Sequence, residues 1–289
     1  MPELPEVETI ARGLAKRVTG DVIESVWLGS KPQTLKSPAA EIAATLENKR
    51  VAGVRRVGKH LVVDLQDAGK AGSRRPKTAR KGKAGVSAPS GQEAQWIVHL
   101  GMTGRMLVCE PGAEIAKHTH AIAKLASGRE LRFVDPRRFG RLSVGHGFKA
   151  AGYEPLEVEL DRFVGLFRRR KTPIKSALLN QKLLSGVGNI YADESLFRAR
   201  IRPRRRTASL TKEDLQRLYL ALQEVLREAI ELGGSSISDY VSADGEEGFF
   251  QLQHRVYGRE GEKCLVCKMP IKRVVIAGRG SHYCPTCQK

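Results

Sequence analysis

The feature that most constrains this chain is a set of four cysteines near its C-terminal end. Two residues separate Cys264 from Cys267, and Cys284 and Cys287 repeat that spacing after a gap of sixteen residues. Two such pairs can bring four thiolates around one zinc ion in a tetrahedral arrangement. Two disulfide bonds are the alternative, but they fit poorly with an N-terminus that does not resemble a secretory signal peptide. We therefore expect a small C-terminal module that folds around one structural zinc ion.

The charge of the chain indicates what it binds. Its 289 residues include 50 Lys and Arg against 31 Asp and Glu, which gives a formal net charge of +19. A surplus of this size attracts polyanions and accelerates encounter with them, so nucleic acid is the expected partner. A solubility device or a ribosome-associated scaffold would also explain the composition. An anionic membrane surface is a further alternative, but the sequence has no basic amphipathic helix with a bulky apolar face.

Two further patterns bear on where the protein works. No stretch approaches the ~18–20 apolar residues that a membrane-spanning helix needs. The N-terminus, MPELPEVETI, holds three acids where a secretory signal would have basic residues and an apolar run. We therefore expect a cytoplasmic protein.

The N-terminal half predicts a helix followed by a series of short strands. In residues 3–18, Pro5 suits the first helical turn, and apolar residues recur at three- and four-residue steps. From about 22 to 65, short β-rich runs surround the more helical AAEIAATLE, and further strand patterns follow from QWIVHLGM to RLSVG. Turn residues separate these runs, so we expect a β-sandwich, or a barrel-like sandwich, with the first helix packed on it.

One segment interrupts the strand pattern. Residues 69–92 contain seven Lys or Arg, no acid and no aromatic residue, together with many small residues and prolines. Such a composition buries too little apolar area to offset the entropy of ordering, so we expect a disordered basic insert that spans about 66–94. It is either a solvated insertion without a function or an arm that binds phosphates without sequence preference.

The C-terminal half has helical patterns. Thr211 and Asp214 form a capping pair ahead of a long apolar stripe. Before it, the segment 173–203 indicates a helix, a glycine-rich turn and a second helix. The whole chain is therefore expected to be of the α+β multidomain class. Its expected parts are a β-sandwich domain over 1–149, a helical domain over 150–240, and a third part over 241–289 that contains the zinc module.

The N-terminus itself can carry chemistry. A small residue at position 2 permits removal of the initiator Met1, which would leave Pro2 with a free secondary amine. An α-amino group has a pKa near ~7.7–8.0, so part of it is unprotonated and nucleophilic at neutral pH. Such an amine can form a Schiff base at a sugar C1′, and Glu3 and Glu6 are close enough in sequence to move protons. Taken alone, these three residues also suit the start of a helix.

Seven segments occur in an order that resembles one enzyme family. They are MPELPEVE at the start, RVGKHLVV around Lys59, HLGMTG around Met102, KHTH at 117–120, DPRRFG at 135–140, GVGNIYADESLF at 186–197 and the terminal cysteines. Together they resemble bacterial formamidopyrimidine-DNA glycosylase of the Fpg/Nei family, a repair enzyme that removes oxidised purines. The resemblance covers nearly the whole chain. The basic insert is the clear departure, because the family usually joins those strands by a shorter connection.

The resemblance implies a role for each matching catalytic residue. Pro2 matches the nucleophile that attacks C1′ of the damaged nucleotide and displaces the base. Glu3 matches the carboxyl group that protonates the opening deoxyribose, and Glu6 matches a helper that positions a water molecule or a proton. Lys59 matches a lysine that serves elimination and holds phosphate, although its spacing alone would fit a surface ammonium. Arg279, on an expected β-hairpin of the zinc module, matches an arginine that holds the phosphates flanking the lesion.

The resemblance also implies how DNA is held. An extruded base leaves a hole in the duplex, and the residues that fill it in the family match Met102, Arg137 and Phe139. Of these, the arginine can donate hydrogen bonds to the orphaned partner base. The turn SGVGN resembles the family's helix–two-turn–helix, where backbone N–H groups bind phosphate and Asn189 adds a side-chain donor. The remaining phosphate-binding candidates are His118, Arg138, Arg170, Lys171 and Lys175.

The residues and the resemblance together predict a bifunctional DNA glycosylase and abasic-site lyase. We expect a monomer that acts on oxidised purines in duplex DNA through a Schiff base on Pro2, with β- and δ-elimination and no redox or nucleotide cofactor. An endonuclease VIII-like enzyme for oxidised pyrimidines is the nearest alternative, and the start PELPEVET, rather than PEGPE, favours the purine enzyme. A catalytically inactive DNA-binding paralogue is another, and the intact candidate catalytic residues argue against it. We expect the loop around 234–254 to choose between 8-oxoguanine and the ring-opened purines.

Overall fold

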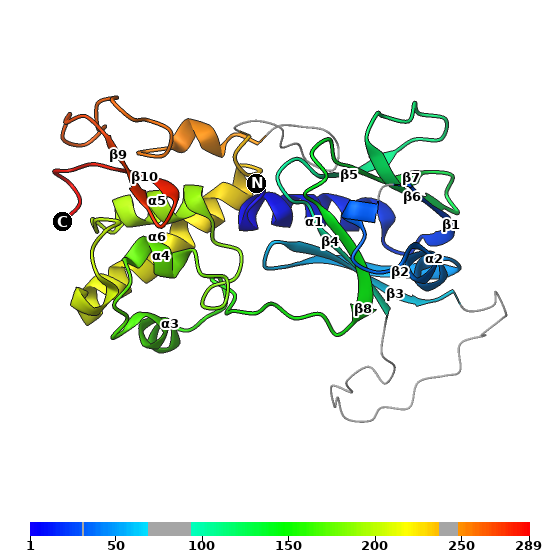
Figure 1. Cartoon of the computed structure of the whole chain (residues 1–289), viewed down its shortest axis with the longest axis horizontal. Coiled ribbons are helices and arrows are strands. Elements are labelled where there is room, and N and C mark those ends of the chain that lie inside the picture. The colour runs from blue at the N-terminus through cyan, green and yellow to red at the C-terminus, as the bar shows by residue number, and fades with distance from the viewer. Residues whose placement is uncertain (31, 69–93, 237–247) are drawn as a thin grey trace, which may run out of the picture.

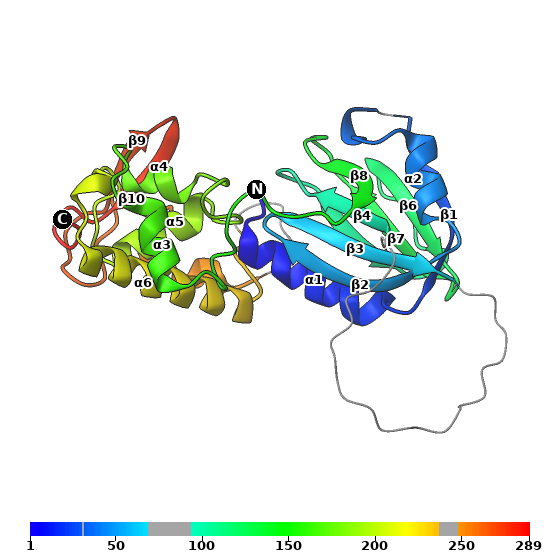
Figure 2. The same ribbon diagram turned by 90° about the horizontal axis from the view of Figure 1, so that it is seen from below.

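The computed structural model of the chain describes residues 1–30, 32–68, 94–236 and 248–289. A β-rich N-terminal part and a largely helical C-terminal part lie side by side along the long axis, and the N-terminus lies where they meet (Figure 1 and Figure 2). The basic segment predicted at 69–92 lies outside the described residues, as does the stretch 237–247 of the predicted lesion loop. None of the helices in the described ranges is long and apolar enough to cross a membrane.

The first helix, α1 (Leu4–Val18), begins where the sequence predicts a helical start. Glu3 and Glu6 form a reciprocal capping box, in which each side chain accepts a hydrogen bond from the backbone N–H of the other residue. Pro5 occupies the first turn, where its missing N–H leaves no helical bond unmade. The apolar face of α1 packs into the core of the N-terminal part, so both predictions about this helix are confirmed.

Eight strands form one antiparallel sheet in the N-terminal part. In spatial order they are β5-β7-β6-β1-β2-β3-β4-β8. Their bounds are Val22–Leu28 (β1), Lys49–Val57 (β2), His60–Asp67 (β3), Ala94–His99 (β4), Arg105–Cys109 (β5), Thr119–Leu125 (β6), Glu130–Val134 (β7) and Arg141–His146 (β8). Met106 on β5 and Val98 on β4 share one apolar core with α1 and with α2 (Ala39–Leu46). The eight-stranded sheet therefore packs around one apolar core, as the predicted sandwich requires.

Two details of the strand pattern differ from the sequence prediction. β3 continues to Asp67 and β4 begins at Ala94, so the predicted insert 66–94 is too long at both ends. Pairing across the sheet explains the first difference, because Asp67 lies opposite Lys49 and the two side chains form an ion pair. Lys59, which the sequence places in a strand-like run, lies in the two-residue turn between β2 and β3.

The C-terminal part contains the predicted helices. They are α3 (Leu160–Phe167), α4 (Ile174–Leu178), α5 (Asn189–Arg198) and α6 (Lys212–Glu231). The capping pair predicted for the longest helix is present, since Thr211 and Asp214 each accept a hydrogen bond from the backbone N–H of the other. Leu4, the first residue of α1, joins the apolar core of these helices. The start of α1 is therefore fixed at the junction of the two parts.

The last part of the chain follows a short 3-10 helix, η3 (Phe250–Gln253). The hairpin predicted to carry Arg279 is confirmed as β9 (Lys272–Ile276) and β10 (Arg279–Tyr283), which pair antiparallel. The backbone N–H of His282 on β10 donates to the Asp193 carboxylate on α5, with N and O 2.9 Å apart. This bond attaches the hairpin to the helix that begins at the glycine-rich turn.

Candidate active site

The N-terminus is anchored at the glycine-rich turn before α5. The backbone N–H of Leu4 donates to the carbonyl of Gly186, with N and O 3.0 Å apart, and Gly186 has a φ of +99° that favours glycine. Pro2 is buried and lines a cavity of about 500 Å³ at the junction of the two parts. The other predicted catalytic residues line the same cavity: Glu3, Glu6, Lys59 and Arg279. The structure thus brings together residues that are up to 277 positions apart in the chain.

Glu3 has one bonded and one unbonded carboxyl oxygen. The backbone N–H of Ile190, in the first turn of α5, donates to Oε1 at 3.2 Å, whereas Oε2 has no hydrogen-bond partner among the described residues. The residue is 4 % exposed. Burial raises the pKa of Glu3 to about 7, while the neighbouring Lys59 opposes this rise and Glu6 adds to it. A carboxyl group with this pKa can donate or accept a proton near neutral pH.

Glu6 is bonded far more completely than Glu3. Its Oε2 accepts from the backbone N–H of Glu3 at 2.8 Å, and its Oε1 accepts from the backbone N–H of Ser235 at 2.8 Å. The hydroxyl group of Tyr191 on α5 also donates to Oε1. Burial raises the pKa of Glu6, and these hydrogen bonds partly offset that effect. Glu6 is therefore held in one position by three different segments.

Lys59 brings an ammonium group to the same cavity from the β2–β3 turn. Gly58, the other turn residue, has a φ of +61°, and a Cβ atom there would lie 2.1 Å from the Ser185 hydroxyl oxygen. Only glycine lets the turn approach so closely. Burial lowers the pKa of Lys59, the two buried carboxyl groups raise it, and Arg279 lowers it further. The exposed Arg279 begins β10, so two cations face the two carboxyl groups beside Pro2.

The three residues predicted to fill the space of an extruded base are exposed. Met102 is 41 % exposed and Phe139 is 47 % exposed, although both side chains are large and apolar. The guanidinium carbon of Arg137 lies 5.0 Å from the centre of the Phe139 ring, within cation–π distance. Met102 follows β4 and the other two follow β7, and Met102 also lines the cavity. This exposed trio suits contact with another molecule beside the candidate active site.

Four of the predicted phosphate contacts are accessible in part or in full. His118 and Arg138 are half-buried and have positive φ values of 70° and 57°. Arg170 and Lys171 are exposed in the segment between α3 and α4. All four stay candidates for binding phosphate.

Lys175 and Asn189, which were predicted to bind phosphate, both donate hydrogen bonds to the backbone carbonyl of Gly280. The ammonium of Lys175 lies 2.7 Å from Oδ1 of Asp193 and donates to the carbonyl of Gly280 at 2.8 Å, and its side chain is 1 % exposed. The side-chain amide of Asn189 donates to the same carbonyl at 3.0 Å. A direct grip of Lys175 on phosphate does not fit this burial. Both residues fix the backbone next to Arg279, and the half-buried Asn189, which lines the cavity, stays a candidate for binding phosphate.

The sequence prediction gave no role to three residues at or next to the cavity. They are Tyr191, which bonds Glu6, and two lining residues, Ser235 and Tyr257. Tyr191 is fully buried in α5 and looks like an ordinary core residue in the sequence. Burial raises the pKa of Tyr257. In the sequence, the only indication of these residues was the predicted lesion loop around 234–254. That loop includes Ser235, but nothing in it distinguishes Ser235 from its neighbours.

The four predicted zinc ligands meet in space. All four Sγ atoms lie within 4.8 Å of one another. Sγ of Cys264 is 3.9 Å from that of Cys287, and Sγ of Cys267 is 3.3 Å from that of Cys284. Zn–S bonds of ~2.3 Å in a tetrahedron place sulfur atoms about 3.8 Å apart, whereas a disulfide bond is ~2.05 Å long. The set therefore forms a structural zinc site, and the alternative of two disulfides is wrong.

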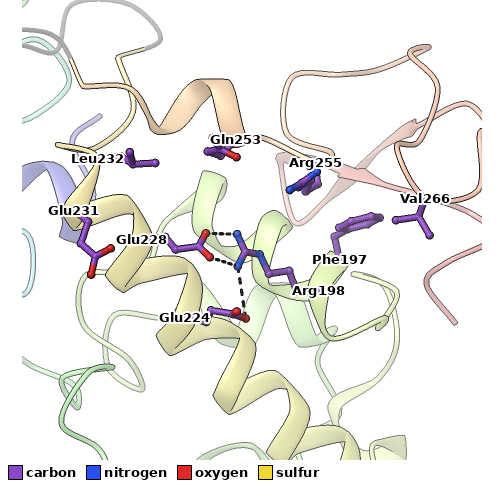
Figure 3. Close-up of a pocket in the computed structure, with 9 residues that line it drawn as sticks. All are labelled: Phe197, Arg198, Glu224, Glu228, Glu231, Leu232, Gln253, Arg255 and Val266. Atoms are coloured by element: carbon purple, nitrogen blue, oxygen red, sulfur yellow. Dashed lines mark hydrogen bonds and ion pairs between the residues drawn. The ribbon is translucent and has the colours of Figure 1, made fainter.

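A second hollow, of about 490 Å³, lies between α5 and α6 (Figure 3). Arg198 spans it, with Nη1 2.9 Å from Oε1 of Glu228 and 3.5 Å from Oε2 of Glu224. These ion pairs tie the end of α5 to α6. No predicted site residue lines this hollow, so the candidate active site is the cavity around Pro2.

Comparisons with known proteins identify the family of the chain. Three family models match the chain: the formamidopyrimidine-DNA glycosylase N-terminal domain over residues 1–142, the H2TH domain of the same enzyme over 152–241, and the zinc finger found in FPG and IleRS over 261–289. A relative from Solibacter usitatus, named formamidopyrimidine-DNA glycosylase, is 42 % identical over 293 residues, which cover 100 % of each chain.

Two solved structures with DNA share the fold. A complex of a Lactococcus lactis FPG mutant with Fapy-dG containing DNA has a TM-score of 0.85 and 32 % identity, and 100 % of each chain is covered. A complex of Lactococcus lactis Fpg with abasic site containing DNA has a TM-score of 0.84 and 33 % identity, with 99 % of each chain covered.

Proposed function

Because the chain belongs to the formamidopyrimidine-DNA glycosylase family, whose members are DNA glycosylases of DNA repair, we propose that it excises oxidised purines from duplex DNA and then cleaves the abasic site. Its proposed substrates are 8-oxoguanine and formamidopyrimidines in the bacterial chromosome, and its proposed location is the cytoplasm. The observation that carries this proposal is the buried Glu3, which has an unbonded oxygen beside Pro2 and Lys59 in one cavity.

The first chemical step uses Pro2 after removal of Met1. The secondary amine attacks C1′ of the damaged nucleotide, a new C1′–N bond forms, and the base leaves with the electrons of the glycosidic bond and takes up a proton from solvent. Pro2 loses its amine proton to Glu3, whose pKa of about 7 suits this transfer. Glu3 then returns the proton to O4′ while the C1′–O4′ bond breaks. The product is an iminium ion between Pro2 and the opened sugar.

Elimination follows from the iminium ion. Loss of a proton from C2′ expels the 3′ phosphate in β-elimination, and a second elimination expels the 5′ phosphate. Water then hydrolyses the imine and frees Pro2. The ammonium of Lys59 lies in the cavity and can offset the charge of a departing phosphate. Glu6, held by three donors, is the helper that positions a water molecule or a proton.

Duplex DNA is the proposed partner, as in the Lactococcus lactis complexes. Met102 and Phe139 fill the space of the extruded base, and Arg137 donates to the orphaned partner base. Arg279 holds the phosphates beside the lesion, supported from behind by Lys175 and Asn189. The remaining phosphate contacts come from His118, Arg138, Arg170 and Lys171.

The rival functions are less well supported. An enzyme for oxidised pyrimidines would share the fold, but the start PELPEVET favours the purine enzyme, and relatives over the whole chain are named formamidopyrimidine-DNA glycosylase. An inactive DNA-binding paralogue would have no need to keep Pro2, Glu3 and Lys59 in one buried cavity.

Borohydride trapping tests the proposal. The protein should form a covalent complex with a duplex that carries 8-oxoguanine opposite cytosine, and mass spectrometry should find the mature N-terminus without Met1. Acetylation of the N-terminal amine should abolish the complex, because an amide nitrogen is not nucleophilic. Undiminished trapping after acetylation would assign the nucleophile to another amine, with Lys59 the first candidate. A protein that retains Met1 and still releases the base would contradict the mechanism.

A further inference from the structure

Two loops present the exposed trio, and their backbones touch. The loop 100–104 between β4 and β5 carries Met102, and the loop 135–140 between β7 and β8 carries Arg137 and Phe139. A Cβ atom on Gly101 would lie 2.5 Å from the backbone nitrogen of Gly140, so only glycine permits this approach. The relative position of the two loops therefore decides how far the side chain of Met102 lies from those of Arg137 and Phe139.

One buried carboxylate is bonded to both loops. Oδ1 of Asp135 accepts from the hydroxyl group of Thr103, with the oxygens 2.6 Å apart, and from the backbone N–H of Arg137 at 3.2 Å. Its other oxygen, Oδ2, accepts from the backbone N–H of Gly140 at 2.7 Å. Asp135 is 0 % exposed and Thr103 is 6 % exposed, so neither side chain can contact DNA itself. Both ends of the second loop and one residue of the first are thus held by a single group.

The backbone of Asp135 is in turn fixed to the sheet. Its N–H donates to the carbonyl of His118 at 3.0 Å, and its carbonyl bonds Nε2 of His120 at 2.9 Å. The carboxylate therefore projects from a rigid position, while the trio it supports is exposed. Hydrogen bonds to an ionised group in a buried place are among the stronger ones in proteins.

We propose that the Asp135–Thr103 pair is a latch that sets the spacing of Met102 from Arg137 and Phe139, so that filling the duplex and reading the orphaned base occur together. Asp135 and Thr103 are positioning residues here, and the latch rests on the proposed function. When the hydrogen bond between Asp135 and Thr103 is lost, the side chains of each loop can still enter the duplex. The two loops then no longer enter it at a fixed distance from each other. Extrusion of the damaged base and selectivity for the opposite base should suffer, whereas bond breaking at Pro2 should not.

The test compares two substitutions of one residue. Thr103→Val keeps the shape but removes the hydroxyl group, and Thr103→Ser keeps the hydroxyl group. In single-turnover assays at saturating enzyme, Thr103→Val should slow release of 8-oxoguanine opposite cytosine by on the order of tenfold. The substitution removes the hydrogen bond to Asp135 and also the longer one, 3.4 Å, that the hydroxyl group accepts from the backbone N–H of Arg137. It should also change the ratio of the release rates measured opposite cytosine and opposite adenine. Thr103→Ser should stay near wild type in both respects.

A second measurement needs no cleavage. A duplex with a tetrahydrofuran abasic analogue and 2-aminopurine as the opposite base reports insertion through its fluorescence. Thr103→Val should reduce the fluorescence change on binding, and cleavage of a natural abasic duplex at saturating enzyme should stay within about twofold of wild type. Thr207→Val is the matched control, because Thr207 is 1 % exposed and its hydroxyl donates to the Thr172 carbonyl at 2.7 Å. It should lower the Tm similarly without changing insertion or selectivity.

Several outcomes would overturn the latch. Equal behaviour of Thr103→Val and Thr103→Ser would show that the hydroxyl group is not what matters. Unchanged fluorescence and selectivity in Thr103→Val would show that the loops keep their register without the bond. If the wild-type protein neither releases 8-oxoguanine nor forms a trapped complex, the proposed function fails, and the fluorescence comparison still decides whether the latch positions the loops.

Discussion

Gly188 offers the sharpest test of the site geometry, because the three atoms nearest to a side chain added there all belong to Glu3. It is the last residue before α5 and has φ −130°, a conformation that any residue can adopt. The reason for glycine is space. A Cβ atom at this position would lie 2.1 Å from the carboxyl carbon of Glu3 and 2.3 Å and 2.5 Å from its two oxygens. Gly188→Ala must therefore displace the carboxyl group.

The size of the displacement follows from these distances. The carboxyl carbon would have to move by about 1.3 Å to reach the 3.4 Å of an ordinary contact. That shift also breaks the 3.2 Å bond from the N–H of Ile190 to Oε1. A misplacement of ~1 Å at a reacting group can reduce a rate by about 100-fold. The loss of stability should be small, because the carboxyl group is the flexible end of the Glu3 side chain and can rotate toward the cavity.

The assay is single-turnover cleavage of a duplex that contains 8-oxoguanine, together with thermal unfolding. We expect Gly188→Ala to slow base release by on the order of 100-fold and to lower the Tm by only a few degrees. Gly165→Ala is the matched control, since a Cβ atom on this exposed residue of α3 would meet no atom within 4 Å. A Gly188→Ala variant that cleaves at the wild-type rate would refute the reasoning that Glu3 acts from its observed position.

Two other perturbations test the charges and the metal. Burial raises the pKa of Glu3 from 4.5 to about 7, so its ionisation opposes folding and wild-type stability should fall as the pH rises through that range. At ~1.4 kcal/mol per pH unit the whole effect is about 3 kcal/mol, and urea unfolding should show Glu3→Gln gaining stability relative to wild type between pH 4.5 and about pH 7 while it loses activity. Removal of zinc, or Cys267→Ser, should abolish duplex binding but leave the thermal transition of the N-terminal part in place, because metal binding and folding are coupled locally. Full affinity in metal-free protein would show that the hairpin with Arg279 does not contact DNA.

Local patterns were enough to predict the elements of this fold. The start of α1, the cap at Thr211 and the two cysteine pairs depend on residues three or four positions apart, so the sequence displays them directly. The positions of Pro2 and Lys59 in one cavity could be expected only through the family resemblance. The predicted domain borders at 149/150 and 240/241 stay predictions.

What the sequence could not show are contacts between distant segments. Lys175 has the residue type of a phosphate ligand, yet its ammonium forms an ion pair with Asp193 on α5, 18 positions further along the chain. The contact of Tyr191 with Glu6 spans 185 positions, and no local pattern distinguishes this tyrosine from a core residue. The need for glycine at 188 likewise arises from the side chain of Glu3, 185 positions earlier in the chain.

The arrangement also explains how an acid can work in a strongly basic protein. A net charge of +19, with Lys59 in the same cavity, favours the ionised form of any carboxyl group, yet the proposed mechanism needs Glu3 to hold a proton near neutral pH. Burial is the larger of the two effects on its pKa. That burial comes from the packing of α1 against the turn before α5, so it exists only while the two parts of the protein are joined. A substitution that loosens this junction should therefore lower the pKa of Glu3. Because Glu3 must be ionised to accept the proton of Pro2, the acid limit of base release should then shift to lower pH, even when every catalytic residue is intact.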